Sequence, residues 1–249
     1  MTKEKVKRQL SLLERLAWFL VGAVFKVFFF VVGKVKVDPR LQETLALYEG
    51  GGAGEVFSQV RVWDAPFEEV EKCVPKTGVI LDLGCGDGLL ANFLALSGSG
   101  RKVVGIEVNE ERLVVARKGI RNVRFEVGDV LKKKIPRADV ILLVHVLHHL
   151  ASYGGQEKLL KECEKSLAKK GKLIIVEIGE RPILKCAVTW LTDAVLYPML
   201  FEKGVFRKFY YRRREAWVKM VKGLGLEAGW KEAHHGKPFS HVIIWGEKR

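Results

Sequence analysis

The feature that most constrains this chain is a short apolar run that ends in three glycines at alternate positions. Residues 79–83 predict a buried strand, and residues 89–96 predict the helix that follows it. The glycines between them, Gly84, Gly86 and Gly88, can adopt positive φ and let a ligand touch the backbone without meeting a Cβ atom. A strand, a glycine turn and a helix in this order are typical of a nucleotide-type cofactor site at the carboxyl edge of a parallel sheet.

Two acids in this turn indicate the charge of the ligand. A dinucleotide-binding fold has the spacing Gly-x-Gly-x-x-Gly and directs a helix N-terminus at a pyrophosphate. Here the spacing is Gly-x-Gly-x-Gly, and Asp82 and Asp87 place negative charge where a phosphate would lie. The turn therefore favours a cationic ligand over a dinucleotide.

Apolar strands and helices continue to alternate after the turn. We expect further strands at residues 102–107, 122–129, 138–144 and 171–177, with a helix over residues 156–170. Alternation at this spacing indicates βαβ units and a parallel sheet.

Together these motifs resemble the class I S-adenosylmethionine (SAM)-dependent methyltransferases, whose cofactor carries an ammonium and a sulfonium group. The resemblance implies that Glu107 accepts both ribose hydroxyls and that Asp129 binds the adenine amino group. The run Val-Leu-His-His-Leu after the fourth strand is similar to the branch that contains quinone and small-molecule methyltransferases. The cofactor-binding residues that the resemblance implies are Asp82, Gly84, Cys85, Gly86, Asp87, Gly88, Glu107, Val108, Asp129, Val130 and His145.

The same resemblance implies an α/β fold with a Rossmann-like, doubly wound, seven-stranded sheet whose last strand is antiparallel. Residues 213–224 would form a helix, and residues 226–233 and 241–246 the last two strands.

The chain divides into three expected segments. Residues 1–36 are expected to form an N-terminal membrane-anchor helix, and residues 37–77 a connector with a flexible glycine-rich hinge at residues 50–54. Residues 78–249 would form the methyltransferase domain, in which the resemblance implies a substrate cap inserted after the fifth strand, at residues 180–212.

The positive charge of the chain is concentrated in two places. The net charge is +14 over 249 residues, of which residues 1–36 contribute +6 and residues 203–222 contribute +7. Both segments adjoin the most apolar parts of the chain. Cations beside apolar helices are typical of binding to an anionic membrane surface. We therefore expect membrane contact through residues 1–36 and 182–214.

The apolar run at residues 16–33 has 18 residues and one charge. As a helix it would reach about 27 Å, just enough to cross a bilayer. A crossing would leave the basic residues before it outside while the SAM domain stays in the cytosol, against the positive-inside rule. Its narrow polar stripe favours a helix lying in the membrane interface, and packing on its own domain or a partner is a third alternative. The expected location is the cytoplasmic face of a membrane, and no cleavable signal peptide is indicated.

The expected cap begins with an amphipathic helix at residues 182–197, which has a proline near each end. Aromatic and basic residues then alternate up to residue 214. This composition favours a lipid-like or anionic amphiphilic small-molecule substrate. An ordinary helical lid with a solvated basic face is the alternative.

Candidate catalytic residues lie where the fourth and fifth strands end. A nucleophile that carries a proton can need a base, and His145, His149 and Glu177 are the candidates. One of His148 and His149 is expected to be a structural hydrogen-bonding residue. No metal is expected, because His145 and His149 have no third ligand nearby and the four cysteines show neither a zinc nor a disulfide pattern.

The leading hypothesis is a membrane-associated, SAM-dependent methyltransferase that acts on a quinone precursor, polyprenyl compound or phospholipid. The alternative is an RNA methyltransferase, since basic chains attract phosphates. Against it, the charge lies beside apolar segments and no RNA-binding module is recognisable, so nucleic acid is not the expected partner. A non-catalytic scaffold is a third reading. Scarce amides, three Asn and four Gln, favour a thermophilic source.

Overall fold

A computed structural model describes residues 37–50, 53–191 and 209–249 of the chain. The expected anchor at residues 1–36 and most of the expected cap lie outside the described residues. Among the helices that are described, none is both long and apolar enough to cross a bilayer.

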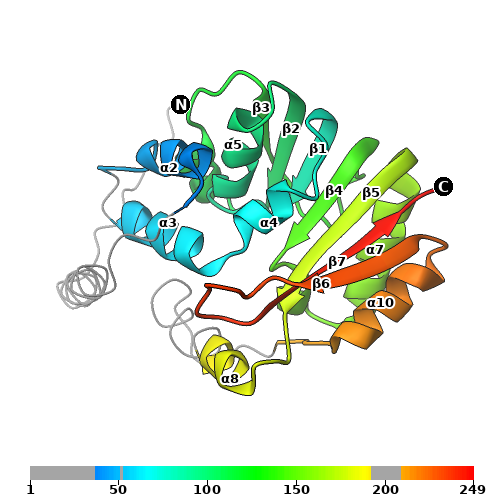
Figure 1. Cartoon of the computed structure of the whole chain (residues 1–249). Helices are drawn as coiled ribbons and strands as arrows, with labels where there is room; N and C mark the ends of the chain where they lie inside the picture. Colours follow the sequence, from blue (N-terminus) through cyan, green and yellow to red (C-terminus); the bar gives the residue numbers. More distant parts are fainter. Residues whose placement is uncertain (1–36, 51–52, 192–208) are drawn as a thin grey trace, which may run out of the picture.

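Seven strands form one twisted sheet at the centre of the domain (Figure 1). Their order is β3-β2-β1-β4-β5-β7-β6, with β1 to β5 parallel and β7 antiparallel to both of its neighbours. This confirms the predicted doubly wound sheet. The strands are β1 Thr77–Leu83, β2 Gly100–Glu107, β3 Val123–Val127, β4 Ala138–Val144, β5 Leu167–Ile178, β6 Glu227–Glu232 and β7 His241–Glu247.

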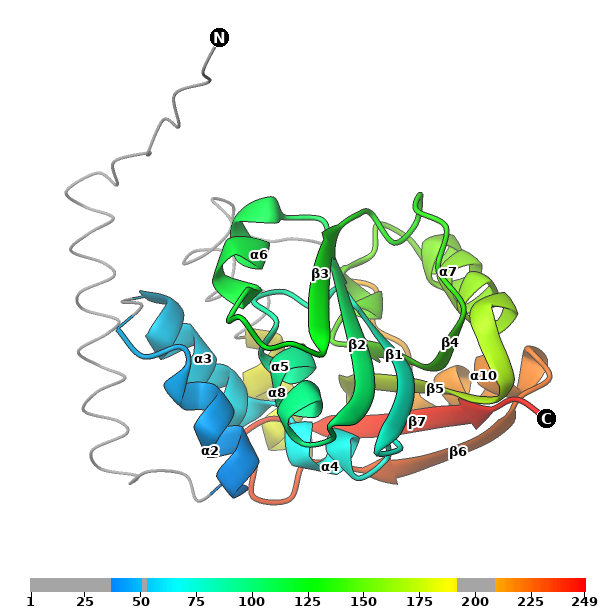
Figure 2. The ribbon, with the colours of Figure 1, turned by 90° about the horizontal axis from the view of Figure 1, so that it is seen from above.

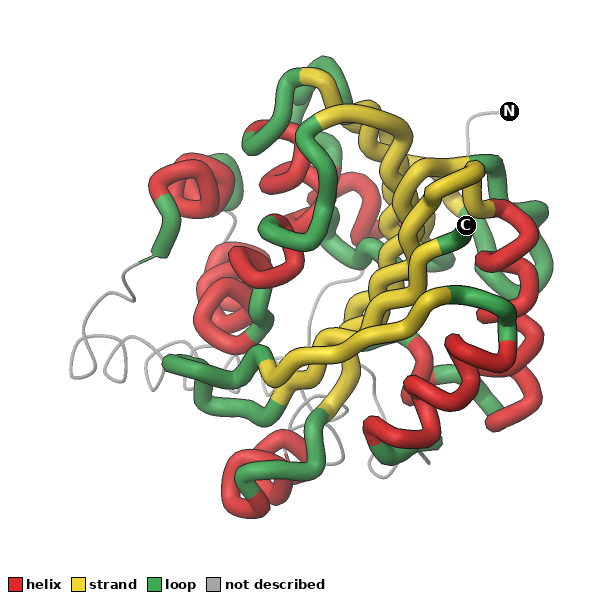
Figure 3. The backbone as a smooth tube through the Cα atoms, turned by 45° about the vertical axis from the view of Figure 1, so that its right-hand side comes forward, coloured by secondary structure: helices red, strands yellow, loops and turns green. Residues whose placement is uncertain are grey.

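Helices cover both faces of the sheet (Figure 3). On one face lie α5 (Leu89–Leu96) and α6 (Glu110–Ala116), and on the other lie α7 (Tyr153–Ser166) and α10 (Arg214–Gly223). Successive strand residues point to opposite faces, so adjacent residues such as Ile174 and Ile175 are fully buried in two different cores. Apolar side chains on both faces explain why these strands read as continuous apolar runs.

Residues 37–77 are not the connector that the sequence suggested. They form α2 (Pro39–Ala46), α3 (Ala53–Asp64) and α4 (Phe67–Glu71); α2 lies beside α5, and α3 lies beside α2 (Figure 2). The expected hinge is shorter than its glycines suggested, because Ala53 and Gly54 begin α3. Burial drives this folding, since Leu41, Phe67 and Val70 enter the core under α5.

One predicted helix boundary also changes. The helix expected up to residue 170 ends at Ser166, because the buried Leu167 turns extended and pairs with Ala138 of β4. The cap helix begins as predicted and is described as α8 (Ile183–Leu191), while its expected continuation lies outside the described residues.

The buried side chain of Arg101 links α4 and α5 to the amino end of the sheet through hydrogen bonds. The guanidinium of Arg101 is fully buried and lies 2.9 Å from Glu71 Oε1. It also donates to three backbone carbonyl oxygens, those of Val74, Pro75 and Leu94, at 2.7–3.0 Å. Leu94 lies in the last turn of α5, and Val74 and Pro75 lie in the loop after α4, so none of these carbonyls has a hydrogen-bond partner within a helix or strand.

We predict that Arg101→Met lowers the free energy of unfolding by about 3 kcal/mol, because it leaves three backbone carbonyls without their donor and leaves the Glu71 carboxylate with only the exposed Lys76 as a partner. Urea unfolding of the full chain measures this. The control is Arg124→Met, which removes an ion pair whose arginine is 69% exposed and should cost less than about 0.5 kcal/mol. Equal losses in the two variants would contradict the prediction.

Candidate active site

The glycine turn follows β1 at the point where the strand order reverses between β1 and β4. Open α/β sheets bind ligands at such a point, outside the carboxyl ends of the strands. Gly84, Gly86 and Gly88 all have positive φ, between 55° and 73°. A Cβ atom on Gly84 would lie 2.7 Å from a methyl carbon of Val146, and one on Gly88 would lie 2.6 Å from the Cβ of Ala116. Packing within the protein therefore requires glycine here, in addition to any approach of a ligand.

Asp82, the last acid before the turn, is buried without a complete set of partners. Its side chain is 2% exposed, and Oδ2 has no hydrogen-bond partner among the described residues. Burial and the neighbouring Glu107 raise the pKa of Asp82 to about 7, while Arg61 on α3 opposes the shift. A buried acceptor left open in this way is suited to a cationic ligand.

Glu107 at the end of β2 joins the two halves of the site. Its Oε2 accepts the backbone N–H of Gly86 at 3.0 Å, and its Oε1 accepts that of Asn109 at 3.0 Å. Each carboxylate oxygen keeps a further lone pair, so Glu107 can hold the turn and still accept hydroxyl groups of a ligand.

Asp87, the second acid of the turn, faces a cation of the protein. Its Oδ1 lies 2.7 Å from Nε of Arg112 on α6, and its backbone oxygen accepts the hydroxyl of Tyr48 at 2.8 Å. The charge available to a cationic ligand therefore comes from Asp82 and Glu107 more than from Asp87. Sequence reasoning missed Tyr48, because residues 37–77 were interpreted as a connector.

The remaining predicted cofactor residues lie along the same edge. Asp129 follows β3 and accepts the N–H of Leu131 at 2.9 Å, a bond that lowers the pKa of Asp129 and keeps it ionised. Val108 is 67% exposed beside Glu107, and Val130 is half-buried. Burial raises the pKa of Cys85, so this residue stays a neutral thiol.

Glu177 at the end of β5 is a positioning group. Its Oε2 lies 2.6 Å from Nδ1 of His148, and its Oε1 accepts the N–H of Leu147 at 3.0 Å. Both side chains are buried, at 2% and 1% exposure. Since a carboxylate can only accept, Nδ1 of His148 donates, and Glu177 fixes the tautomer of His148. Glu177 was predicted as a base, but its two oxygens already hold this loop. One of His148 and His149 was expected to be a structural hydrogen-bonding residue, and His148 is the one that pairs with Glu177.

His145 begins the loop after β4, and the same loop carries His149. His145 has φ +57°, which is uncommon outside glycine, and its N–H donates to the carbonyl of Val176 at 3.0 Å. Its Nε2 is buried with no partner in the described part of the chain. His149 is exposed, and its ring lies 5.2 Å from that of Phe209.

The segment that returns from the cap lies against this histidine loop. Tyr210 donates its N–H to the carbonyl of His148 at 3.0 Å, and Gln156 of α7 donates to the carbonyls of Leu147 and Tyr210. The ring of Tyr211 stacks on that of His148 at 5.2 Å. The structure therefore brings the end of the cap to the carboxyl edge of β4 and β5.

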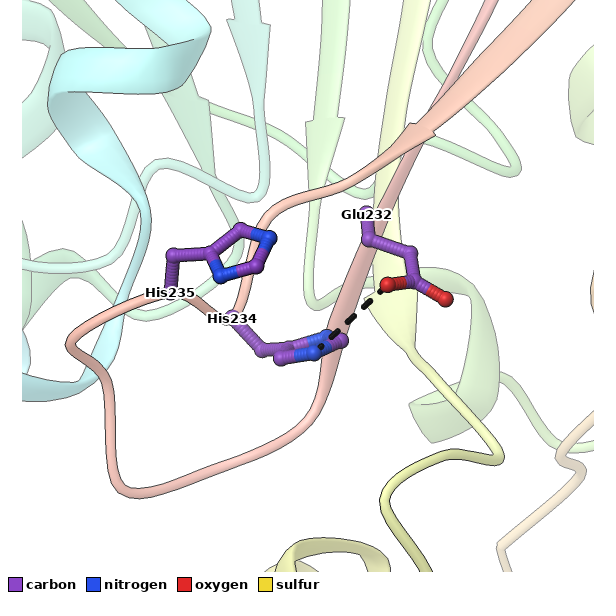
Figure 4. A group of neighbouring side chains, drawn as sticks. All are labelled: Glu232, His234 and His235. Atoms are coloured by element: carbon purple, nitrogen blue, oxygen red, sulfur yellow. Dashed lines mark ion pairs between the residues drawn. The ribbon is translucent and has the colours of Figure 1, made fainter.

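A second group of polar side chains lies where β6 ends and the loop to β7 begins (Figure 4). Glu232, His234 and His235 offer ligand atoms that all lie within 4.8 Å of one another. The two imidazoles stack at 30°, however, and the ammonium of Lys185 donates to the carbonyl of His234 at 3.0 Å. In stacked imidazoles the ring faces point toward each other, while the nitrogen lone pairs lie in the ring planes and point elsewhere. The fixed ammonium of Lys185 would also repel a bound metal cation. We assign no metal to this group.

A model of the methyltransferase domain family matches residues 76–206, more than half of the chain. The chain belongs to this family. The ubiquinone biosynthesis O-methyltransferase of Coxiella burnetii is 30% identical over 106 residues, and the demethylmenaquinone methyltransferase of Thermotoga maritima is 27% identical over 100. Each match covers 40% of this chain and 43% of the relative, so this methyltransferase chain matches less than half the length of these curated relatives.

The fold also has solved counterparts. Magnesium protoporphyrin IX methyltransferase from Synechocystis, crystallised with bound S-adenosylhomocysteine, aligns over 93% of this chain and 97% of its own, with a TM-score of 0.57 at 15% identity. This likeness concerns the fold alone.

The residues of this methyltransferase site fit SAM, the cofactor of the family. Asp82 would hold its ammonium group, Arg61 lies nearby for its carboxylate, and Glu107 and Asp129 would hold the ribose and the adenine. When bound, SAM supplies an electrophilic methyl group on a positively charged sulfur.

We predict that SAM binding weakens as pH falls below about 7, by up to about tenfold per pH unit, because Asp82 must lose its proton to pair with the ammonium. Asp82→Asn should weaken binding about tenfold at pH 7.5 and flatten the pH dependence. Calorimetry between pH 5.5 and 7.5 measures both effects. Asp139→Asn is the control, since Asp139 accepts the N–H of Val79 at the opposite edge of the sheet. A pH-independent affinity in the unaltered protein would contradict the assignment.

Proposed function

We propose that this protein transfers the methyl group of SAM to a hydrophobic or amphiphilic acceptor, of quinone, polyprenyl or phospholipid type, at the cytoplasmic surface of a membrane. The observation that carries the proposal is a pair of exposed apolar side chains beside cations at the start of the cap. Ile183 and Leu184 on α8 are 79% and 77% exposed, the two highest values among the large apolar side chains described.

Basic residues at the two ends of the cap suit a membrane surface. Arg181 precedes α8, and the side chain of Arg213, where the chain leaves the cap, is 83% exposed and lies 4.0 Å from Glu180. Apolar side chains that enter the bilayer together with cations that reach anionic head groups are the usual composition of a peripheral membrane contact. The charge excess in residues 1–36 and 203–222 has the same character.

Aromatic rings beside the histidine loop support an apolar acceptor. Phe209 and Tyr211 stack at 5.6 Å, and their rings lie 5.2–6.0 Å from those of His148 and His149. The aromatic wall formed by Phe209 and Tyr211 offers a flat apolar surface to the ring or the hydrocarbon chain of an acceptor. The two bacterial relatives are named for quinone methylation, which is chemistry of the same class.

We predict that replacing both Ile183 and Leu184 by serine lowers binding to vesicles that contain anionic lipid by about tenfold, because less apolar area enters the bilayer. Flotation of the full chain with such vesicles measures this. Removing residues 1–33 should weaken binding further, and high salt should weaken the remaining electrostatic part.

The matched control is Val114→Ser on α6, since Val114 is 64% exposed yet belongs to a helix beside β3. Equal binding by all of these variants would argue against a membrane contact. Binding to RNA with a steep salt dependence, in place of vesicles, would favour the RNA methyltransferase alternative. Incubating a membrane lipid extract with SAM labelled in its methyl group, and identifying the labelled product, tests the acceptor class directly.

A further inference from the structure

A histidine and an aspartate far from the predicted motifs meet at the same edge of the sheet. His241 is the first residue of β7 and pairs with Ile178, the last residue of β5. Its Nε2 lies 2.8 Å from Oδ1 of Asp64 and 3.1 Å from the backbone oxygen of Asp64, the last residue of α3. The His241 side chain is fully buried, and that of Asp64 is 10% exposed.

These contacts determine which nitrogen of His241 can accept a proton. The carboxylate Oδ1 and the backbone oxygen of Asp64 can only accept hydrogen bonds, so Nε2 of His241 must be the donor. In the neutral ring the lone pair is then on Nδ1, which is buried and has no partner within the described ranges. A buried acceptor that is left open has a cost of folding, which suggests a use.

His145 lies directly against this pair. The centroids of the His145 and His241 rings are 4.9 Å apart, in an edge-to-face arrangement at 65°. Nε2 of His145 is likewise buried without a described partner, and the left-handed backbone of His145 is a conformation that functional sites often retain at a cost in stability. Two imidazole rings, each with one buried nitrogen that has no described partner, therefore lie side by side where β4 and β5 end and β7 begins.

The charges around His145 keep it neutral. Burial lowers the pKa of His145 well below its ordinary value, and His241, Arg61, His148 and His149 add to the shift. A neutral imidazole offers a lone pair at neutral pH. Asp64 faces this group through the ring of His241 and is also paired with Arg61 at 3.3 Å. Glu177 faces it through the ring of His148.

We propose that His145 accepts the proton of an acceptor hydroxyl, and that Asp64 and His241 are its positioning residues. The inference rests on the proposed function and narrows the acceptor to one methylated on oxygen. In this step the O–H bond breaks and its proton moves to Nε2 of His145. The oxygen uses the freed electron pair to bond the methyl carbon, while the carbon–sulfur bond breaks and leaves a neutral thioether.

The step keeps the charge of the site constant. One positive charge is lost from sulfur as one forms on His145, and the Asp64 carboxylate lies one ring away from the new charge. A phenolic hydroxyl, whose pKa is about 10, is a suitable donor, since an imidazole of low basicity can share its proton as the new bond forms. The aromatic wall of Phe209 and Tyr211 offers a flat apolar surface on which the ring of such an acceptor can pack.

The test uses the full chain in vesicles, with a catechol that carries a short prenyl chain as the probe. His145→Gln should lower kcat about 100-fold or more, and Asp64→Asn about tenfold, because a general base of this kind contributes roughly 100-fold to 10,000-fold. Asp64→Asn should also move the acid limb of the kcat/KM profile to lower pH, since losing the negative charge makes the base weaker. His235→Gln is the control with unchanged kcat, because His235 is exposed on the β6–β7 loop.

A second readout does not depend on the probe. Nitrogen NMR of the histidines should show His241 protonated on Nε2 and His145 losing its positive charge at a pH well below that of an exposed histidine, and Asp64→Asn should shift the nitrogen signals of His241. Thermal unfolding identifies a variant that fails only in folding, and Asp64→Glu should partly restore kcat.

The outcomes separate the two proposals. Normal kcat in His145→Gln, or an acid limb that Asp64→Asn does not move, would overturn the inference while the methylation of an apolar acceptor stands. Loss of kcat in His148→Gln alone would assign the base to the His148–Glu177 pair instead. If the unaltered protein binds SAM but does not methylate the probe, the acceptor class is wrong. An ordinary titration of His145 in the NMR experiment would then overturn the inference on its own.

Discussion

The burial of Asp82 beside Glu107 is the constraint on which the site depends. Both acids are almost fully enclosed at the carboxyl edge of the sheet, and burial together with Glu107 makes the charged form of Asp82 costly. Glu107 is held by two backbone N–H groups, so it cannot turn away. The pair therefore favours any ligand that brings positive charge, and the three glycines leave the backbone open beside it. A cationic methyl donor satisfies this requirement, whereas a pyrophosphate would add to the repulsion.

At the carboxyl edge of the sheet the same arrangement occurs twice: a buried carboxylate fixes the tautomer of a histidine. Glu177 holds His148, and Asp64 holds His241, at 2.6 Å and 2.8 Å. His145 lies between them, with its ring 6.2 Å from that of His148 and 4.9 Å from that of His241. Strand ends supply Glu177 and His241, the end of α3 supplies Asp64, and His145 and His148 belong to the loop after β4 that these groups hold. The backbone N–H of His145 also donates to Val176 of β5, so strand and helix ends orient this loop, as oriented proton transfer requires.

The helices before β1 belong to this arrangement. α3 supplies Asp64 and Arg61, and the segment after α2 supplies Tyr48, which reaches the glycine turn. A segment that looked like a connector thus completes the site. The residues after α2 lie beside the cofactor turn, while α8 and Phe209 bring the two ends of the cap to the same edge of the sheet.

The sequence by itself determined the order of strands and helices, the glycine turn and the acids that follow β1, β2 and β3. These are local signals, because apolar periodicity and glycine spacing act within a few residues. It also located the loop after β4 and the limits of α10. Only the tertiary structure decided that α2 to α4 enter the core, that Glu177 is occupied by His148, and that Asp64 meets His241 across 177 residues of sequence. Such pairs depend on which strand ends and helix ends the sheet brings together, and no spacing along the chain encodes that distance.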